Sequence, residues 1–334
     1  MATRRPRIQD VARKAGVVPS TVSRVLNDYP DVSAETRAKV ERAIESLGFR
    51  PSQAARAFRG GRTHSVSIML PMPGTEFYAR LLTGIESVLD EHAYSAGLFP
   101  LLTLPGLERY RDADALPYRA DGLLLASLDP ERVFQGGRPP VALPLVLVDS
   151  RHPAFDWIAL DNAAGGRLAA QVLNERPAET FVILIRERFD TPFASGVFNE
   201  RLQGFKAALA EGHGRLDDDH VVTVEFSASG GGLATRHILE VARGPVNIFA
   251  TCDLVARGVL EEGLRGGKTP GSDLRVVGFD GEEWTEGAGL TTIEQPIEEM
   301  GRAAARALLV RLADETLPPR HTLLEPRLIR RSSA

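Results

Sequence analysis

The feature that most constrains this chain is a pair of short amphipathic patterns within residues 8–27. Apolar residues recur at helical spacing on both sides of Gly16, which separates the two patterns. Gly16 can adopt the positive φ of a tight turn, and Pro19 suits the first turn of a second helix, where its missing N–H is not needed. The spacing therefore predicts a helix-turn-helix. Neither helix is long enough to be stable alone.

The outward face of the second predicted helix is slim and polar. It carries Pro19, Ser20, Thr21, Ser23, Arg24 and Asn27. Such a face fits a DNA major groove about 12 Å wide, where short side chains reach base edges and phosphates. The pattern alone also fits a helical hairpin inside a larger bundle, so it leaves both interpretations open.

The run D-V-A-R-K-A-G-V-V-P-S-T-V-S-R-V-L-N resembles the DNA-binding signature of the lactose and galactose repressor family, usually D-V-A-x-x-A-G-V-S-x-x-T-V-S-R-V-L-N. The resemblance implies a DNA-binding head. Val18 stands where the family has a serine that caps the recognition helix and contacts a phosphate, so we expect capping weaker by about 1 kcal/mol. The base-choosing positions of the family are Pro19 and Ser20 here. Pro19 offers only apolar contact, whereas Ser20 can hydrogen-bond to several bases.

The next segments complete a head at residues 1–50 and a linker at residues 51–63. A third helix is expected to begin after Ser33 and to end before Gly48. The linker contains an eight-residue helical pattern that would be unstable alone. Without the resemblance, a flexible tether is the simplest interpretation. The resemblance implies a hinge helix that pairs with its twin in the minor groove, with three DNA-contacting residues: Ala55, Arg56 and Phe58.

Charge is distributed unevenly along the chain. Residues 1–63 hold 13 Lys and Arg against 6 Asp and Glu, while the remainder holds 27 against 38. A basic head on an acidic body is typical of a domain attracted to phosphate. The single cysteine, Cys252, excludes an intramolecular disulfide and fits a reducing compartment. No apolar run reaches the roughly 18 residues that a membrane span requires, and no signal peptide is recognisable. We therefore expect a cytoplasmic protein with no membrane segment and no cofactor.

From residue 64 onward, short apolar runs alternate with longer helical patterns, which predicts parallel sheets covered on both faces. More strands are expected than one such sheet usually holds, which indicates two similar lobes. The expected strands are 65–70, 122–125, 145–148, 181–185, 221–226, 247–250 and 274–277, and the expected helices include 78–92, 163–173, 200–210, 233–242 and 255–264.

Four motifs extend the resemblance to the end of the chain: V-V-G-F-D-G at 276–281, L-T-T-I-E-Q-P at 290–296, E-M-G-R-A-A-A at 299–305 and E-P-R-L-I-R-R-S at 325–332. It implies an effector-binding and dimerisation domain at 64–334, an α/β body of two doubly wound parallel-sheet lobes that resemble periplasmic sugar-binding proteins. The three crossings between lobes fall near Asp161, Thr292 and Thr322. Lobe 1 would then span about 64–161 and 293–322, and lobe 2 about 162–292 and 323–334. The sequence shows no leucine-rich tail of the kind that makes tetramers in this family, so we expect a homodimer.

Ligands of open α/β sheets bind beyond the carboxyl ends of strands. The candidates at those ends are Phe77, Tyr78, Ser127, Phe226, Cys252, Asp253 and Asp280. Arg201 matches the family's effector-contacting arginine and Asp280 its aspartate, and such a pair beside aromatic rings suits the vicinal hydroxyls of a sugar. The aromatic residues also fit an ordinary core. Cys252 replaces a frequent asparagine, and Gly281 replaces a second aspartate.

Enzyme chemistry has little support in the sequence. The run S-A-S-G-G-G-L at 227–233 lacks the spacing of phosphate-binding loops, and we expect an ordinary loop there. The histidines show neither metal-ligand spacing nor a pairing with Cys252 as nucleophile. We therefore expect a repressor that binds a pseudo-palindromic double-stranded operator and responds to a small-molecule effector. The alternative is a cytoplasmic small-molecule binding protein or sugar enzyme, whose DNA affinity would lack a steep salt dependence.

Overall fold

The computed structural model describes residues 6–26, 29, 31–49, 62–72, 74–134, 136–187, 195–212 and 215–334. The chain divides into two compact units, Met1–Thr63 and His64–Ala334. Four of the expected DNA-contacting residues lie outside the described residues: Asn27, Ala55, Arg56 and Phe58.

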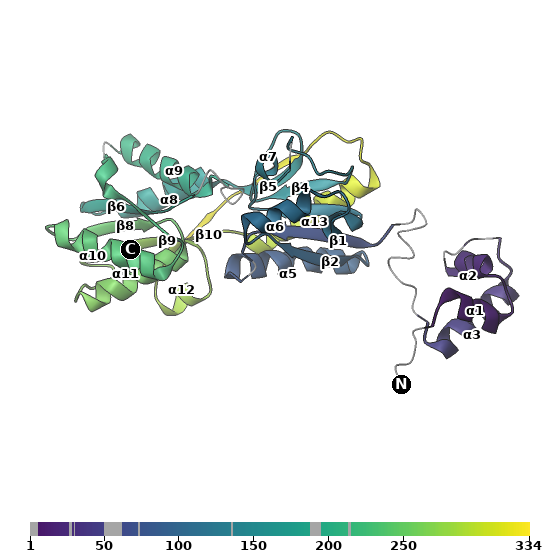
Figure 1. The fold of residues 1–334 in the computed structure, drawn as a ribbon. Helices are drawn as coiled ribbons and strands as arrows, with labels where there is room; N and C mark the ends of the chain where they lie inside the picture. Colours follow the sequence, from purple (N-terminus) through teal and green to yellow (C-terminus); the bar gives the residue numbers. More distant parts are fainter. Residues whose placement is uncertain are drawn as a thin grey trace. The chain divides into compact units, whose positions relative to one another are not determined.

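The described part of the first unit is helical, as expected, with α1 (Ile8–Ala15), α2 (Pro19–Leu26) and α3 (Ala34–Leu47) (Figure 1). α1 ends at Gly16, whose φ of 68° is the left-handed conformation that the turn requires. The Ser33 hydroxyl accepts a hydrogen bond from the Thr36 amide and so caps α3. The helices share a small core around Val11, Val22 and Val40, all completely buried. The predicted helix-turn-helix and third helix are confirmed.

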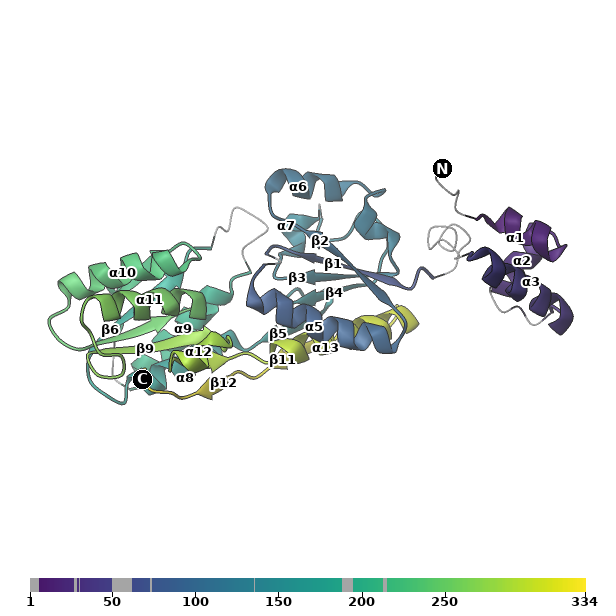
Figure 2. The ribbon, with the colours of Figure 1, turned by 90° about the horizontal axis from the view of Figure 1, so that it is seen from below.

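The second unit consists of two lobes, each built on a six-stranded sheet (Figures 1 and 2). The sheet of lobe 1 has the order β11-β5-β4-β3-β1-β2 and that of lobe 2 the order β12-β10-β9-β8-β6-β7. Neighbouring strands are parallel except β12, which runs antiparallel to β10. The two doubly wound lobes expected from the alternating pattern are confirmed.

The elements of lobe 1 are β1 (Ser65–Leu70), α5 (Glu76–Glu91), β2 (Ser95–Pro100), α6 (Leu104–Glu108), η1 (Arg109–Arg111), η2 (Leu116–Arg119), β3 (Gly122–Ala126), α7 (Pro130–Val133), β4 (Leu145–Val148), β5 (Asp156–Leu160), α13 (Ile297–Ala313) and β11 (His321–Leu324). Those of lobe 2 are α8 (Asn162–Leu173), β6 (Glu179–Ile185), α9 (Val197–Glu211), η3 (Asp218–His220), β7 (Val221–Val224), α10 (Ala228–Val241), β8 (Val246–Ala250), α11 (Asp253–Arg265), β9 (Leu274–Asp280), α12 (Trp284–Gly287), β10 (Thr291–Glu294) and β12 (Arg327–Ile329).

The central strands are buried on both faces, which explains their continuous apolar sequences. In lobe 1, Ile68 and Val146 pack under α5 and α13, whereas Met69 and Leu147 pack on the opposite face against α6, α7 and the short helical turns. In lobe 2, α8 and α9 cover one face of the sheet and α10 and α11 cover the other (Figure 1). Because helices cover both faces of each sheet, the carboxyl ends of the strands are the places where polar residues can gather.

The glycine-rich run at 227–233 is not a loop, contrary to expectation. Ser227 caps α10 by accepting a hydrogen bond from the Gly230 amide at 3.0 Å, and the glycines form the first turns of that helix. A Cβ on Gly231 would lie 2.2 Å from the Val255 carbonyl oxygen, so glycine lets α10 approach α11 to backbone contact. The run therefore serves helix packing.

The chain crosses between the lobes three times, and Figure 2 shows the last crossing as the yellow ribbon from β11 to β12. The first crossing falls at Asp161, between β5 and α8. β10 remains in the sheet of lobe 2 through Glu294 and β11 in that of lobe 1 through Leu324. The second and third crossings therefore fall at residues 295–296 and 325–326, a few residues after the expected positions.

Candidate functional site

A polar cavity of about 250 Å³ lies where the carboxyl ends of lobe 1 strands meet the first turns of lobe 2 helices. Its lining residues come from both lobes: Asp129, Asp149, Ser150, Arg151, Ala159, Asn162, Ser195, Val197 and Glu200. Three residues that follow strands facing this region have positive φ although they are not glycine: Ser127 at 50°, Asp149 at 53° and Asp280 at 124°. Such backbone strain concentrates at functional sites.

Asp149 is the main polar group that lobe 1 brings to the cavity. It follows β4, is 7% exposed, and its Oδ2 accepts a hydrogen bond of 2.8 Å from the Ser127 hydroxyl. The hydroxyl of the buried Tyr78 lies close to Ser127, and burial raises its pKa. Burial raises the pKa of Asp149 to about 6, an effect that the Ser127 hydrogen bond only partly offsets. Of the residues expected at the site, Ser127 thus contacts Asp149, and Tyr78 lies close enough to interact with Ser127.

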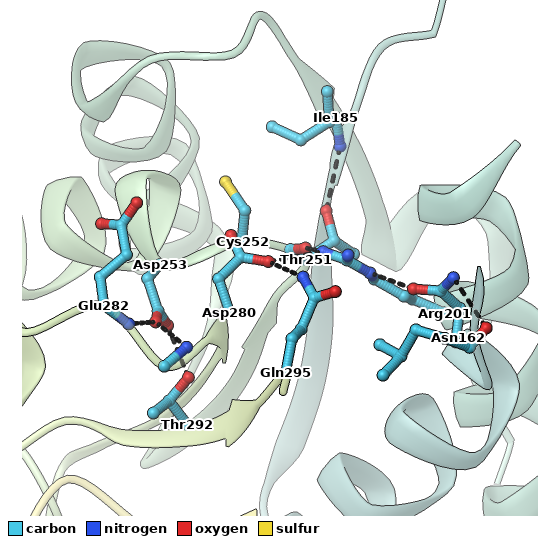
Figure 3. Close-up of polar contacts among 12 residues, drawn as sticks. Asn162, Ile185, Arg201, Thr251, Cys252, Asp253, Asp280, Glu282, Thr292 and Gln295 are labelled. Atoms are coloured by element: carbon cyan, nitrogen blue, oxygen red, sulfur yellow. Dashed lines mark hydrogen bonds and ion pairs between the residues drawn. The ribbon is translucent and has the colours of Figure 1, made fainter. Parts of the chain in front are cut away.

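Arg201 of α9 is the centre of the polar network in lobe 2 (Figure 3). Its guanidinium donates to Asn162 Oδ1 at 2.9 Å, to the Thr251 carbonyl at 2.7 Å and to Asp280 Oδ1 at 3.2 Å. It also lies 3.7 Å from the centroid of the Phe279 ring, a cation–π contact. Arg201 is only 3% exposed, so its orientation is fixed by these contacts.

Asp280 forms an ion pair with Arg201, and both residues belong to lobe 2. Its Oδ1 also accepts a hydrogen bond of 2.6 Å from Gln295 Nε2, which lies at the second crossing between lobes. Burial raises the pKa of Asp280, and Arg201 and Gln295 oppose that shift by stabilising the carboxylate. Through Gln295, the Arg201–Asp280 pair is therefore linked to the second crossing between the lobes.

Cys252 and Asp253 are completely buried, and their polar atoms are used by the fold. Asp253 Oδ2 accepts from the amides of Gly281 and Glu282, and its Oδ1 accepts from the Thr292 hydroxyl at 2.7 Å (Figure 3). Cys252 Sγ accepts from the Val255 amide at the start of α11, and burial raises the pKa of its thiol well above the usual value. In this conformation the two residues support the turn after β9.

The aromatic residues expected beside the ligand also pack in or against the hydrophobic core. Phe77 packs edge-on to Tyr78 with centroids 5.0 Å apart, and both contact the main hydrophobic cluster. Phe226 lies 6.4 Å from Phe198, which in turn lies 5.1 Å from the Arg201 guanidinium. Phe198 is the aromatic residue near Arg201 that the sequence did not single out.

Contacts on two sides join the lobes. On one side, Arg151 approaches Glu200 at 3.3 Å and donates to the Leu160 carbonyl. On the other, Arg80 of α5 donates to the Gly281 carbonyl at 3.0 Å, next to Asp280. Polar contacts thus hold the lobes together, and one of them, between Arg151 and Glu200, lines the cavity where a ligand can compete with it.

Asp149, Arg151, Asn162 and Glu200 were missed in the sequence. Asp149 could have been found, because it follows β4 just as Ser127 follows β3 and the same rule for strand ends applies. Arg151, Asn162 and Glu200 carry no such signal, since they reach the cavity through the folding of loops and helix starts.

In the first unit, the outward face of α2 is accessible as expected. Ser20 and Arg24 are exposed, Thr21 and Ser23 are half-buried, and Val18 before the helix is 60% exposed. The Arg24 guanidinium forms an ion pair with Asp31 and lies 5.2 Å from the Tyr29 ring centroid. Exposed pairs of this kind are weak and can exchange for a phosphate.

Arg37 of α3 stabilises the end of α2, a role that the sequence did not suggest. Its guanidinium donates to the Val25 carbonyl at 3.3 Å and to the Tyr29 carbonyl at 3.1 Å. A cation at the carboxyl end of a helix satisfies orphan carbonyls and complements the helix dipole.

We expect the free energy of unfolding to depend on Asp149 protonation. The carboxyl binds its proton more tightly in the folded protein (pKa about 6) than in the unfolded chain (3.8). Stability from this group is therefore complete below pH 3.8 and is lost as the pH rises through about 6, by about 3 kcal/mol in total. The measurement is urea denaturation of the parent and of Asp149→Asn between pH 4 and pH 8. As the pH rises, the free energy of unfolding of the variant should increase relative to that of the parent. A constant difference would contradict the assignment.

Among the described residues, no group of His, Cys, Asp and Glu is arranged to hold a metal ion. No helix in the described part of the chain is long and apolar enough to cross a membrane.

Comparison with known proteins matches residues 7–52 to "Bacterial regulatory proteins, lacI family" and residues 170–334 to "Periplasmic binding protein-like domain". The ribose operon repressor of Escherichia coli is 32% identical over 98% of this chain and 99% of its own length. The solved structure of the transcriptional regulator CelR in complex with cellobiose is 30% identical, covers 99% of this chain and all of its own, and has a TM-score of 0.72. The lac repressor dimer bound to operator and the anti-inducer ONPF is 23% identical over 99% of each chain, and its TM-score of 0.84 shows the same fold.

Proposed function

Since the chain belongs to the lacI family of bacterial regulatory proteins, we propose that a sugar bound in the cavity between its lobes controls its repression of an operator. It is a DNA-binding transcriptional regulator and not an enzyme. The observation that carries the proposal is the buried Arg201–Asp280 pair against the face of Phe279, beside a polar cavity lined by both lobes. The proposed compartment is the cytoplasm, where a bacterial operator is found.

Several features support a sugar as the effector. Sugar hydroxyls both donate and accept hydrogen bonds, and the cavity region presents carboxylates, an amide and guanidinium groups close together. The structural relative CelR is described in complex with cellobiose. The proposed contacts on the lobe 1 side are Asp149 and Ser127, and on the lobe 2 side Arg201 and Asp280. Phe77, Tyr78, Phe226, Cys252 and Asp253 remain proposed effector-site residues, and none of them lines the cavity in this conformation.

The contact with DNA is proposed to be made by the outward face of α2. Val18, Pro19, Ser20, Thr21, Ser23, Arg24 and Asn27 are the proposed contacts in the major groove, while Ala55, Arg56 and Phe58 are the proposed contacts in the minor groove. Base edges carry the sequence information in the major groove, and phosphates carry none. The proposed roles of Ser20 and Arg24 therefore differ.

Ser20→Ala is expected to change which operator variants bind best, by about 1 kcal/mol at one base position, because Ser20 occupies a base-choosing position. Arg24→Ala is expected to weaken binding to all variants alike and to reduce the salt slope by about one, because Arg24 contacts phosphate. The measurement is fluorescence anisotropy on a set of single-base operator variants at several salt concentrations. Selectivity of Ser20→Ala identical to that of the parent would refute the assignment.

A homodimer is proposed from the edge of the lobe 1 sheet. β2 is an edge strand of this sheet. Leu98 in β2 and Leu102 and Leu104 after it form an apolar surface, with exposed fractions of 47%, 63% and 48%. An exposed edge strand with adjacent apolar side chains is a surface that another chain can cover. A twofold dimer also matches the twofold symmetry of a pseudo-palindromic operator.

Leu98→Asp is expected to shift the protein toward monomer in sedimentation equilibrium and to weaken operator binding at least about tenfold, because a charge would be buried in the interface. Val241→Asp on lobe 2 is the control, since Val241 is 51% exposed at the end of α10. If Leu98→Asp remains as dimeric as the parent, this surface is not the interface.

A further inference from the structure

Charge pairing around the cavity leaves one carboxylate without a cation. Asp129 accepts from the Arg132 guanidinium at 2.9 Å, Glu200 lies 3.3 Å from Arg151, and Asp280 lies 3.2 Å from Arg201. Each of these acidic groups therefore has its own partner. Asp149 receives a hydrogen bond from the neutral Ser127 hydroxyl and forms no ion pair among the described residues.

The groups facing Asp149 strengthen this imbalance. On the lobe 1 side, Ser127 hydrogen-bonds to Asp149 and Tyr78 lies within its electrostatic influence, and neither residue carries a charge. On the lobe 2 side, the charges that act on Asp149 are those of Arg201, Glu200 and Asp280. The positive charge of Arg201 is already shared with Asp280 and with two further acceptors. The electrostatic surroundings of Asp149 thus favour an added positive charge and disfavour a negative one.

Two buried acceptor atoms in this region also lack a donor. Asp149 Oδ1 and Gln295 Oε1 accept no hydrogen bond in the described part of the chain, although Gln295 is 1% exposed. Gln295 Nε2 is committed to Asp280, which fixes the amide so that its oxygen is the unpaired atom (Figure 3). Buried acceptors normally find donors. Asp149 lines the cavity, so its unpaired Oδ1 indicates that a ligand supplies the donor.

We propose that Asp149 selects the effector by charge, so that the cavity favours a sugar which brings a hydrogen-bond donor and no negative charge to Asp149 Oδ1. A protonated amino group at that position of the sugar supplies both the donor and the missing cation, and therefore binds more tightly than a hydroxyl. A phosphate or carboxylate would place a second unpaired anion beside Asp149. This inference rests on the proposed function, because it assumes that the effector is a sugar bound in this cavity.

The test uses the full-length protein and matched sets of sugars. Glucose, galactose and mannose are each compared with the 2-amino sugar, the uronic acid and the 6-phosphate by thermal shift and by calorimetry at pH 7.5. In any set that binds, we expect the amino sugar to have a Kd about tenfold below that of the neutral sugar, and the anionic members to bind at least about tenfold more weakly than the neutral one. Asp149→Asn should remove the advantage of the amino sugar. Asp219→Asn, in an exposed turn of lobe 2, is the matched control and should retain it.

The outcomes separate the two proposals. An anionic member that binds most tightly, or an Asp149→Asn variant that keeps the parental order of affinities, overturns the charge inference. If no sugar binds while operator binding is intact, the sugar class and the charge inference are both wrong, and the DNA-binding function stands. Failure of the parent to bind operator would contradict the proposed function. In that case the sugar titrations would still decide whether the cavity prefers a cationic sugar to a neutral or anionic one.

Discussion

Replacing Arg201 with alanine is expected to abolish the response to effector and to destabilise the second unit by about 3–5 kcal/mol. The substitution removes the cation that pairs with the buried Asp280 and the donors that Asn162 and the Thr251 carbonyl accept from. Removing one partner of a buried pair leaves an uncompensated charge, which accounts for the magnitude. Calorimetry with the effector and urea denaturation measure the two effects.

A variant that unfolds would say nothing about binding, so Asp280→Asn is measured beside Arg201→Ala. Asparagine has the size of aspartate, and its amide oxygen can still accept from the Arg201 guanidinium, which also keeps Asn162 and the Thr251 carbonyl as acceptors. We therefore expect this variant to lose less stability than Arg201→Ala, to fold, and to bind effector more weakly. Operator binding in the absence of effector should persist in both variants, because the first unit has its own core. Effector affinity of a folded Arg201→Ala protein equal to that of the parent would remove Arg201 from the site.

Gly204→Ala is expected to lower the free energy of unfolding by about 3 kcal/mol or more and to weaken effector binding. A Cβ on Gly204 would lie 2.0 Å from the Ala163 carbonyl oxygen, and one on Gly166 would lie 2.0 Å from the Arg201 carbonyl oxygen. α8 and α9 are thus in direct backbone contact, and an added methyl group forces them apart. The displaced helix, α9, carries both Arg201 and Glu200.

The control for this prediction is Gly287→Ala in α12, where an added Cβ meets nothing within 4 Å. That variant should be as stable as the parent or slightly more stable, since alanine restricts the unfolded chain. Thermal unfolding of the three proteins is the measurement. A Gly204→Ala protein with the parental Tm would show that the two helices separate without cost.

The strands most visible in the sequence are those buried on both faces. β1 and β4 occur at the predicted bounds, because their sequences are continuous apolar runs. Five strands were missed: the edge strands β2, β11 and β12 and the interior strands β5 and β10. β2 contains Gly97 and Pro100 and is partly exposed along its length, while β11 is mostly exposed, so neither shows an apolar run. Edge position is a property of the assembled sheet and leaves little trace in a short segment.

The residues of the site were predictable only where their position after a strand, or a family motif, indicated them. Position after a strand indicated Ser127 and Asp280, and the family motif indicated Arg201, which does contact Asp280. The same positional rule also selected Asp253, whose carboxylate turns inward to the amides after β9. Residue type and position do not show the direction of a side chain. Glu200 and Asn162 reach the cavity from helix starts, which the rule for strand ends does not cover.

The central claim, that a ligand between the lobes controls DNA binding by the head, is tested most directly by one titration. An operator selected in vitro from random duplex DNA is bound by the full-length protein, and the sugar that stabilises the protein best is added while anisotropy is followed. We predict that the sugar changes the operator Kd of the parent by about tenfold or more, and that it leaves the operator Kd of Asp280→Asn unchanged at the same concentration. A sugar that saturates the parent, as shown by calorimetry, without changing its operator Kd would contradict the account.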